Sequence, residues 1–276
     1  MNQKELKQLH NKILEIVEYF DEFCKENGIT YYLMGGSALG AIRHHGFIPW
    51  DDDFDVFMDF ENYSKFLDIV DAKLDKTRFY FQKENTKEWL LYFSKIRING
   101  TTFIEENLKD KDMHHGIYID IMCLNNASNL KSIRYMQYLS ARVLSAIALS
   151  HSSYKTDSLF KKIMLYFAKY LDNDFVKNTL LGFVRYFNSK ESDLVGHFFG
   201  RASFSKTSFS KNYLGKQRYV KFEHLTLPVA SEVEKYLTLR YGKDYMQLPS
   251  EEVKAQYPSH ACIVDTQKSY KLFMPF

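Results

Sequence analysis

The chain has 276 residues, 45% of them hydrophobic and 26% charged, which suits one large soluble domain or two small ones. Its formal net charge of +3 and its scattered lysines do not favour a nucleic-acid-binding protein, and its three widely separated cysteines form no zinc motif. The sequence contains neither the apolar segment of a signal peptide nor a run of roughly 18 apolar residues that could span a membrane. We therefore expect a cytoplasmic protein.

The amino-terminal part predicts a helix, a short strand and a second helix. Between residues 4 and 27 apolar side chains recur at three- and four-residue spacings, and Asn27-Gly28 ends this amphipathic helix. Residues 29–34 are apolar and predict a short buried strand. A turn at Gly35-Gly36 follows, and a further helix can begin at Ser37.

A strand is predicted at residues 53–58, because Phe54, Val56 and Met58 alternate with polar neighbours and share one face. Asp59 can cap the helix that follows. Further strands are predicted at 78–82, 89–98, 101–105 and 117–123, and Asn99-Gly100 is a strong hairpin signal between the second and third of these.

The pattern changes from strands to helices near residue 129. Residues 129–190 predict helices throughout, a Ser/Lys-rich loop follows at 203–211, and a hairpin at 219–229 leads into a final helix near 231–241. We therefore expect an α/β (α+β) fold with a mixed sheet and flanking helices. Its core would comprise residues 1–128 and 193–276, and residues 129–192 would form a helical insertion.

A cluster of carboxylates is the strongest chemical signal. On an extended strand Asp53 and Asp55 project from one face, about 7 Å apart, where they can hold a divalent cation. Asp51 could join them, whereas Asp52 would point away. The alternative is a solvated acidic turn. The preceding Pro49-Trp50 and the apolar alternation within the segment favour the metal site over that alternative.

Asp120 is the only charged residue in the apolar segment 117–123. A buried carboxylate needs a cation or hydrogen-bond donors. It could be a third metal ligand beside Asp53 and Asp55, or it could form a structural ion pair with Lys95 or Arg97. The presence of the first two acids favours the metal ligand.

Several further residues could contact phosphate groups. Backbone N–H groups at the turn formed by Gly35, Gly36 and Ser37 suit a phosphate at a helix start, although the turn matches no established phosphate-binding motif. Arg43 could bind phosphate or lie free on the surface. Lys95 and Arg97 share a strand face, where they could meet phosphates or balance the acids.

The glycine turn and the acid cluster together closely resemble the signature of the LicD family. The resemblance covers roughly residues 12–125 and 218–260. It is carried by Gly35 through His44, Gly46 through Val56, Gly116 through Ile121, and a carboxyl-terminal block with Phe222-Glu223, Leu227-Pro228, Tyr236-Leu237, Tyr241-Gly242 and Leu248-Pro249.

The resemblance implies a nucleotidyltransferase-like fold, distantly similar to the fukutin-related proteins. Family members transfer phosphocholine or a related polyol phosphate from a CDP-activated donor to a glycan hydroxyl, on teichoic acid, lipopolysaccharide or capsule. By position the catalytic and metal-binding acids are Asp53, Asp55 and Asp120, and Asp51 matches a further acidic position. The chain departs from the family at Ser37-Ala38-Leu39 and at 122–125. Because the metal-binding acids are kept, these departures bear on the identity of the substrate more than on metal binding.

The sequence thus predicts a phosphotransferase that uses Mg²⁺ or Mn²⁺ and works at the inner face of a membrane. Its partners would be CDP-choline, or another CDP-linked donor, and a lipid-linked or polymeric glycan acceptor. An aromatic cage for choline could come from Tyr31, Tyr32, Trp50 and Phe57. A nucleotidyltransferase acting on a small acceptor and a non-catalytic nucleotide-binding protein remain the alternatives. The helical middle could pack within the domain or touch the membrane peripherally.

Overall fold

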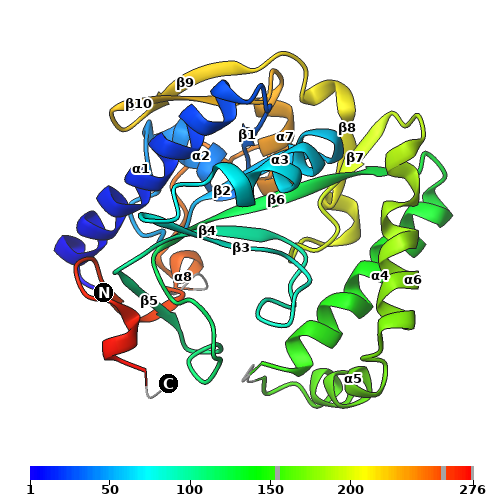
Figure 1. Cartoon of the computed structure of the whole chain (residues 1–276). Coiled ribbons are helices and arrows are strands. Elements are labelled where there is room, and N and C mark those ends of the chain that lie inside the picture. The colour runs from blue at the N-terminus through cyan, green and yellow to red at the C-terminus, as the bar shows by residue number, and fades with distance from the viewer. Residues whose placement is uncertain (153–155, 256–258, 275–276) are drawn as a thin grey trace.

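A computed structural model describes residues 1–152, 156–255 and 259–274 of the chain. Figure 1 shows a central twisted sheet with helices packed against it and a group of three helices, α4 to α6, at one end. This arrangement confirms the α/β class expected from the sequence. The helices are α1 (Gln3–Glu26), α2 (Gly35–His44), α3 (Phe60–Lys73), α4 (Lys131–Ser150), α5 (Leu159–Tyr170), α6 (Asp174–Arg185), α7 (Val233–Tyr241) and α8 (Glu251–Lys254).

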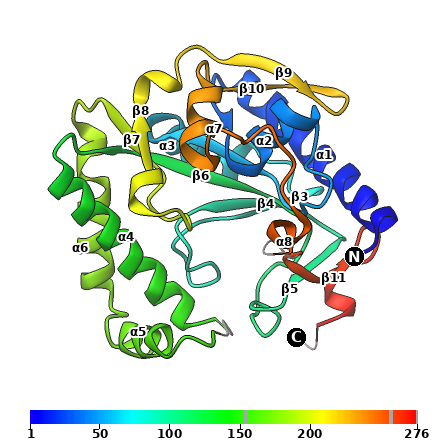
Figure 2. The ribbon, with the colours of Figure 1, turned by 180° about the vertical axis from the view of Figure 1, so that it is seen from behind.

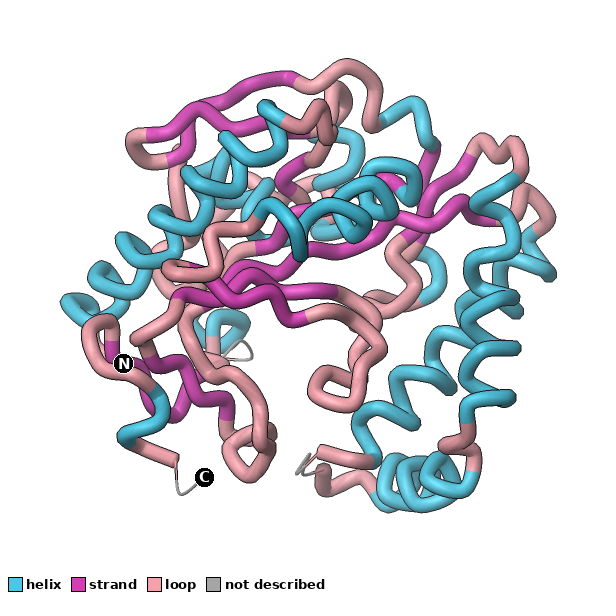
Figure 3. The backbone as a smooth tube through the Cα atoms, viewed as in Figure 1, coloured by secondary structure: helices cyan, strands magenta, loops and turns pink. Residues whose placement is uncertain are grey.

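The central sheet is mixed and has the strand order β3-β4-β6-β2-β1-β10-β9, which Figure 3 shows as a continuous band of strands. The pairs β2–β6 and β1–β10 are parallel, and the other pairs are antiparallel. The far end of β6 also pairs with β7, which pairs with β8. The strands are β1 (Tyr32–Leu33), β2 (Asp55–Asp59), β3 (Phe79–Gln82), β4 (Ser94–Ile98), β5 (Thr102–Glu105), β6 (Tyr118–Ala127), β7 (Leu194–Gly196), β8 (Ser208–Ser210), β9 (Arg218–Phe222), β10 (Leu225–Val229) and β11 (Ala261–Asp265).

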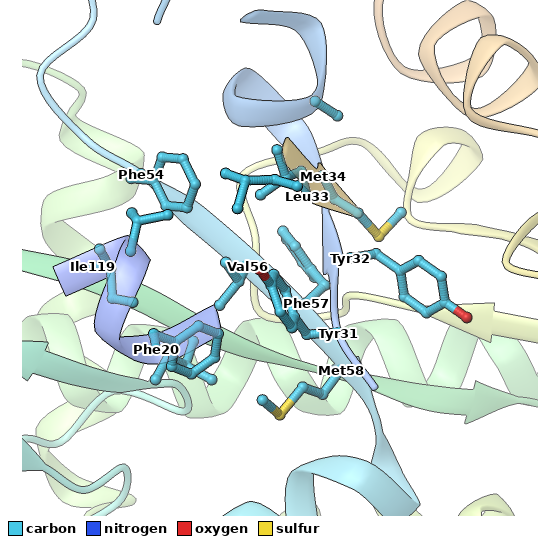
Figure 4. Close-up of a cluster of buried hydrophobic side chains, with 14 of the residues drawn as sticks. Phe20, Tyr31, Tyr32, Leu33, Met34, Phe54, Val56, Phe57, Met58 and Ile119 are labelled. Carbon is cyan, nitrogen blue, oxygen red and sulfur yellow. The ribbon is translucent and has the colours of Figure 1, made fainter. Parts of the chain in front are cut away.

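Apolar side chains cover one face of the sheet. Phe20 from α1 lies in one buried cluster with Val56 and Met58 of β2 and Ile119 of β6 (Figure 4). Because side chains alternate between the two faces of a strand, this packing directs Asp55 and the neighbour of Ile119, Asp120, to the opposite face. The apolar alternation in the sequence therefore decides where the acids lie.

Several predicted elements are confirmed. The first helix ends at Glu26 with Asn27 as its cap, the side chain of Asp59 accepts the N–H of Asn62 at the start of α3, and β9 and β10 form the predicted hairpin. The last predicted helix appears as α7. The helix at the glycine turn begins earlier than predicted, at Gly35 itself.

The hairpin predicted at Asn99-Gly100 is wrong. A turn does form there, with Gly100 at a positive φ of 75°, but β4 and β5 do not pair. The reason is that β3 and β6 occupy both edges of β4. The following strand, β5, pairs instead with β11, which the sequence did not predict.

Two other predictions need correction. Residues 89–93 do not extend β4, because the indole N–H of Trp89 donates to the carbonyl of Phe93 at 2.7 Å and closes a loop. The predicted loop 203–211 contains β8, which pairs with β7. Residues 129–190 are helical as expected, but in three helices whose first connection includes residues 153–155, outside the described part.

The helical group α4–α6 has a small core of its own, and the division of the chain into three segments stays a prediction. Ala141, Leu144 and Val184 pack there with Phe198, which follows β7. A buried ion pair joins this group to the sheet side: Arg185 Nη2 lies 2.5 Å from Glu84 Oε1, and the Glu84 side chain is only 4% exposed. Within the described residues, no helix is both long and apolar enough to cross a membrane.

Replacing Arg185 by Leu should lower the free energy of unfolding by about 3 kcal/mol, because the Glu84 carboxylate would stay buried without its cation. Chemical denaturation of the purified variant measures this. Arg218→Leu is the matched control, since the Arg218–Glu234 pair is 41% and 50% exposed and such pairs contribute at most about 1 kcal/mol. Equal losses in the two variants would contradict the role of the buried pair.

Candidate active site

Three adjacent strands carry two acids and a lysine in a row on the face of the sheet opposite to Phe20. Asp55 of β2 is directly opposite Asp120 of β6, and Asp120 is directly opposite Lys95 of β4. Directly opposed residues on neighbouring strands point to the same face. The Lys95 ammonium lies 2.9 Å from Asp120 Oδ1, so the ion pair considered as an alternative for Asp120 is present.

Asp53 lies just ahead of this row. The strand that carries it was predicted to start at residue 53, but β2 starts at Asp55. Pairing with β6 begins at the Phe54 carbonyl, which accepts the N–H of Asp120 at 2.9 Å. Asp53 is therefore close to the acids without belonging to the regular ladder. Its carboxylate is partly open to solvent, with the side chain 25% exposed.

The carboxyl groups of this cluster repel each other and have raised pKa values. Burial and the neighbouring Asp53 raise the pKa of Asp51 to about 8. Burial together with Asp53 and Asp120 raises the pKa of Asp55 well above its usual range. Burial raises the pKa of Asp120 to about 6, against the opposing effect of Lys95. Such a set of acids has unused capacity to bind a cation.

The glycine turn packs directly against these acids. Gly35, at a φ of +62°, and Gly36 begin α2, and a Cβ on them would lie 3.2 Å from Asp55 Oδ2 and 2.8 Å from Asp51 Oδ2. The hydroxyl of Ser37 accepts the N–H of Asp55 at 2.8 Å. The positive end of the α2 dipole thus faces the acid cluster. Only residues without a Cβ allow this close approach.

The Gly35 N–H, one of the groups predicted to cradle phosphate, already has a partner within the protein. It donates to the hydroxyl of Tyr236 on α7 at 3.0 Å. Tyr236 lies in the carboxyl-terminal block that resembles the family. This contact ties the glycine turn to the last part of the fold.

Lys95 is buried among aromatic rings and acids. Its ammonium lies 3.2 Å from the centre of the Tyr118 ring and 5.0 Å from that of Trp89. It also lies 3.7 Å from Glu105 Oε1 on β5. Although burial opposes it, Lys95 lowers the pKa of Glu105. Cation–π contacts and two carboxylates together offset the desolvation of this lysine.

The other predicted basic residues have structural partners. Arg97, 1% exposed, donates to Gln82 Oε1 and to the Gly116 carbonyl, both at 2.8 Å. Arg43 donates to the carbonyls of Tyr245 and Gln247 after α7. The structure brings Lys95 to the acids but directs these two arginines to backbone carbonyls.

The four rings considered for a choline cage each have contacts within the protein, and the cage stays a prediction. Trp50 contacts His44 and Lys254, and Phe57 contacts the ring of His197. The Tyr31 hydroxyl donates to Asp21, and that of Tyr32 donates to the Gly215 carbonyl. Tyr32 of β1 is directly opposite Phe57 of β2, so these two rings lie on the same face of the sheet as Asp55.

Ser259 and His260, just before β11, bind the acid motif, and no local pattern in the sequence predicts this contact. His260 Nδ1 lies 2.7 Å from Asp52 Oδ1, and the Ser259 hydroxyl and the His260 N–H donate to Asp52 Oδ2 at 2.6 and 2.8 Å. Asp52, which was predicted to point away from the other acids, is still close enough to Asp53 to share the His260 imidazole with it. His260 Nδ1 also lies 3.8 Å from Asp53, and hydrogen bonding to Asp52 raises the pKa of His260 to about 9.

The described residues do not contain a preformed cage for a metal ion. No group of three or more of their His, Cys, Asp or Glu side chains is placed so that it could hold one. The donor chemistry nevertheless suits Mg²⁺, which proteins often hold through one or two carboxylates while substrate phosphates and water complete its shell. Asp53 and Asp55 fit this smaller requirement, and Asp120 is paired with Lys95.

Without metal, the protein should lose stability as the pH rises from about 4 to about 8. Asp51 in the folded state keeps its proton up to about pH 8, whereas the unfolded chain releases it near pH 4. The folded state therefore binds more protons in this window, so raising the pH favours unfolding. Asp51→Asn should reduce the drop in melting temperature between about pH 5 and about pH 8, in EDTA, by roughly 2 °C or more.

Asp68→Asn on the exposed side of α3 is the control for this measurement and should keep the wild-type drop. An equal drop in the Asp51→Asn variant would show that Asp51 is not protonated in the folded protein.

Comparisons with known proteins match the region that contains the site. Residues 28–120 match the family model described as LicD/FKTN/FKRP, nucleotidyltransferase domain. The chain is 29% identical over 255 residues to the lipopolysaccharide cholinephosphotransferase LicD of Haemophilus influenzae, covering 90% of this chain and 92% of that protein. It is also 25% identical over 124 residues to mannosyltransferase regulator 4 of Saccharomyces cerevisiae, but these span 42% of this chain and only 10% of the yeast protein. Residues 28–120, which contain the acids of the site, are therefore similar to the LicD/FKTN/FKRP nucleotidyltransferase domain, in agreement with the resemblance seen in the sequence.

Proposed function

We propose that the protein is a metal-dependent phosphotransferase. It moves phosphocholine, or a related polyol phosphate, from a CDP-activated donor to a hydroxyl of a cell-surface glycan precursor and releases CMP. The observation that carries this proposal is the set of mutually repelling acids, Asp53, Asp55 and Asp120, beside a helix start at the glycine turn. The long match to a lipopolysaccharide cholinephosphotransferase supports the transferred group.

Asp53 and Asp55 are the proposed ligands of Mg²⁺ or Mn²⁺. When bound, such an ion neutralises charge on the donor phosphates and on the departing CMP. The raised pKa values of these acids support the assignment, because a bound cation would relieve their repulsion. Lys95, which pairs with Asp120, would add a second positive charge near the transferred phosphate.

Asp120 is the proposed general base. A carboxyl group with its pKa raised to about 6 can both accept and release a proton near neutral pH. In this step the acceptor O–H proton passes to Asp120, a bond forms from the acceptor oxygen to phosphorus, and the bond from phosphorus to the CMP oxygen breaks. Lys95 would hold Asp120 in place and keep it partly ionised.

Choline is the preferred headgroup, and ribitol and glycerol are the alternatives. The similarity to the Haemophilus lipopolysaccharide cholinephosphotransferase supports choline and also supports a lipopolysaccharide acceptor over teichoic acid or capsule. We place the reaction at the inner face of the membrane, where a lipid-linked or polymeric acceptor would be reached.

Asp53→Asn and Asp55→Asn should each reduce turnover of CDP-choline by about 10²-fold or more, since each removes a charge that stabilises the transition state. Steady-state release of CMP measures this with purified protein. Both variants should stay folded, because neutralising an acid in this cluster removes repulsion. Asp68→Asn should keep wild-type turnover, and near wild-type rates in either site variant would overturn the metal assignment.

A further inference from the structure

The helix α5 carries an apolar face that points to solvent instead of into the protein. Leu159, Ile163, Tyr166, Phe167 and Tyr170 recur at helical spacing and so lie along one side of the helix. Their exposed fractions run from 47% to 71%, and Phe167 is 62% exposed. Ala168, on the opposite side, is buried, and α5 packs on α4. In most surface helices the apolar side faces the core, whereas in α5 it faces solvent.

This apolar face lies at an extremity of the molecule. Figures 1 and 2, which view the protein from opposite sides, show α5 lying across the ends of α4 and α6. In both views it is at the edge of the molecule opposite to β9 and β10. Phe175, at the start of α6, is a further exposed apolar side chain, 81% exposed. An edge of this kind can meet a flat surface without rearrangement of the fold.

Every charged side chain on α5 itself is positive, whereas Asp157 lines the hollow beside α5 and the 93% exposed Asp174 begins α6. Neither α4 nor α5 contains an Asp or Glu, whereas α5 carries Lys161, Lys162 and Lys169. By helical geometry Lys162 and Lys169 flank the apolar stripe. They also line an open hollow with Ser150 and Ser152 of the α4 end. Lysines at the border of an apolar stripe can extend their ammonium groups to the headgroups of a bilayer.

We propose that α5 is a docking surface for an anionic lipid bilayer, with the helix lying in the plane of the interface. The apolar stripe would enter the boundary between headgroups and acyl chains, and the lysines would contact anionic headgroups. A second copy of the chain is a poorer occupant, because two such faces would bring the flanking lysines together. This inference goes beyond the proposed function and does not depend on catalysis.

Flotation of the full chain with lipid vesicles tests the inference. The protein should bind vesicles of phosphatidylcholine mixed with anionic phosphatidylglycerol, and it should bind vesicles of phosphatidylcholine alone at least about tenfold more weakly. Ile163→Ser combined with Phe167→Ser should weaken binding to the anionic vesicles by at least about tenfold, since both side chains are exposed and leave the core unchanged.

A second pair of variants examines the charges separately. Lys162→Ser combined with Lys169→Ser should weaken binding and remove its sensitivity to salt. Lys216→Ser combined with Lys221→Ser, at exposed positions near β9, is the matched control and should bind as the wild type does. No binding to anionic vesicles, equal losses in the two lysine pairs, or loss of a solution dimer in the Ile163/Phe167 variant without loss of vesicle binding would each overturn the inference.

Discussion

The repulsion among Asp51, Asp53, Asp55 and Asp120 is the constraint on which the rest of the site depends. Burial is the main cause of the raised pKa of each of these groups, and a neighbouring carboxylate raises it further, Asp52 in the case of Asp53. The fold meets this repulsion with positive charge from several directions: Lys95 from β4, the start of α2, and His260 from the segment before β11. These compensations come from distant parts of the chain, so the acid cluster can exist only in the complete fold.

These positive groups offset the charge of the acids only in part. Lys95 is shared between Asp120 and Glu105, and His260 is bonded mainly to Asp52. Asp53 and Asp55 keep raised pKa values, and within the described residues no lysine forms an ion pair with either of them. Stability alone would favour replacing such acids by neutral side chains. Their presence fits a site that is completed by a cation and a phosphorylated donor.

The local sequence pattern predicted on which face of β2 Asp55 lies, because strand alternation is a local property. Val56 and Met58 are buried as expected, and this orientation fixes Asp55 on the opposite face. The pairing of Asp55 with Asp120 needed the parallel register of β2 and β6, which no local signal encodes. His260 and Glu105 were missed for the same reason, since β11 and β5 bring them to the acids from far along the chain. The hairpin at Asn99-Gly100 failed because a turn signal cannot reveal that both edges of β4 are occupied.

In the proposed reaction the headgroup phosphate moves to the acceptor and the nucleotide departs. Phosphorus NMR of a reaction containing CDP-choline, Mg²⁺ and a glycan acceptor tests this, because it identifies both products. We expect CMP in solution and a phosphodiester that links choline to the glycan, with no reaction in EDTA. Free phosphocholine together with a cytidylylated acceptor would contradict this expectation and would indicate a nucleotidyltransferase.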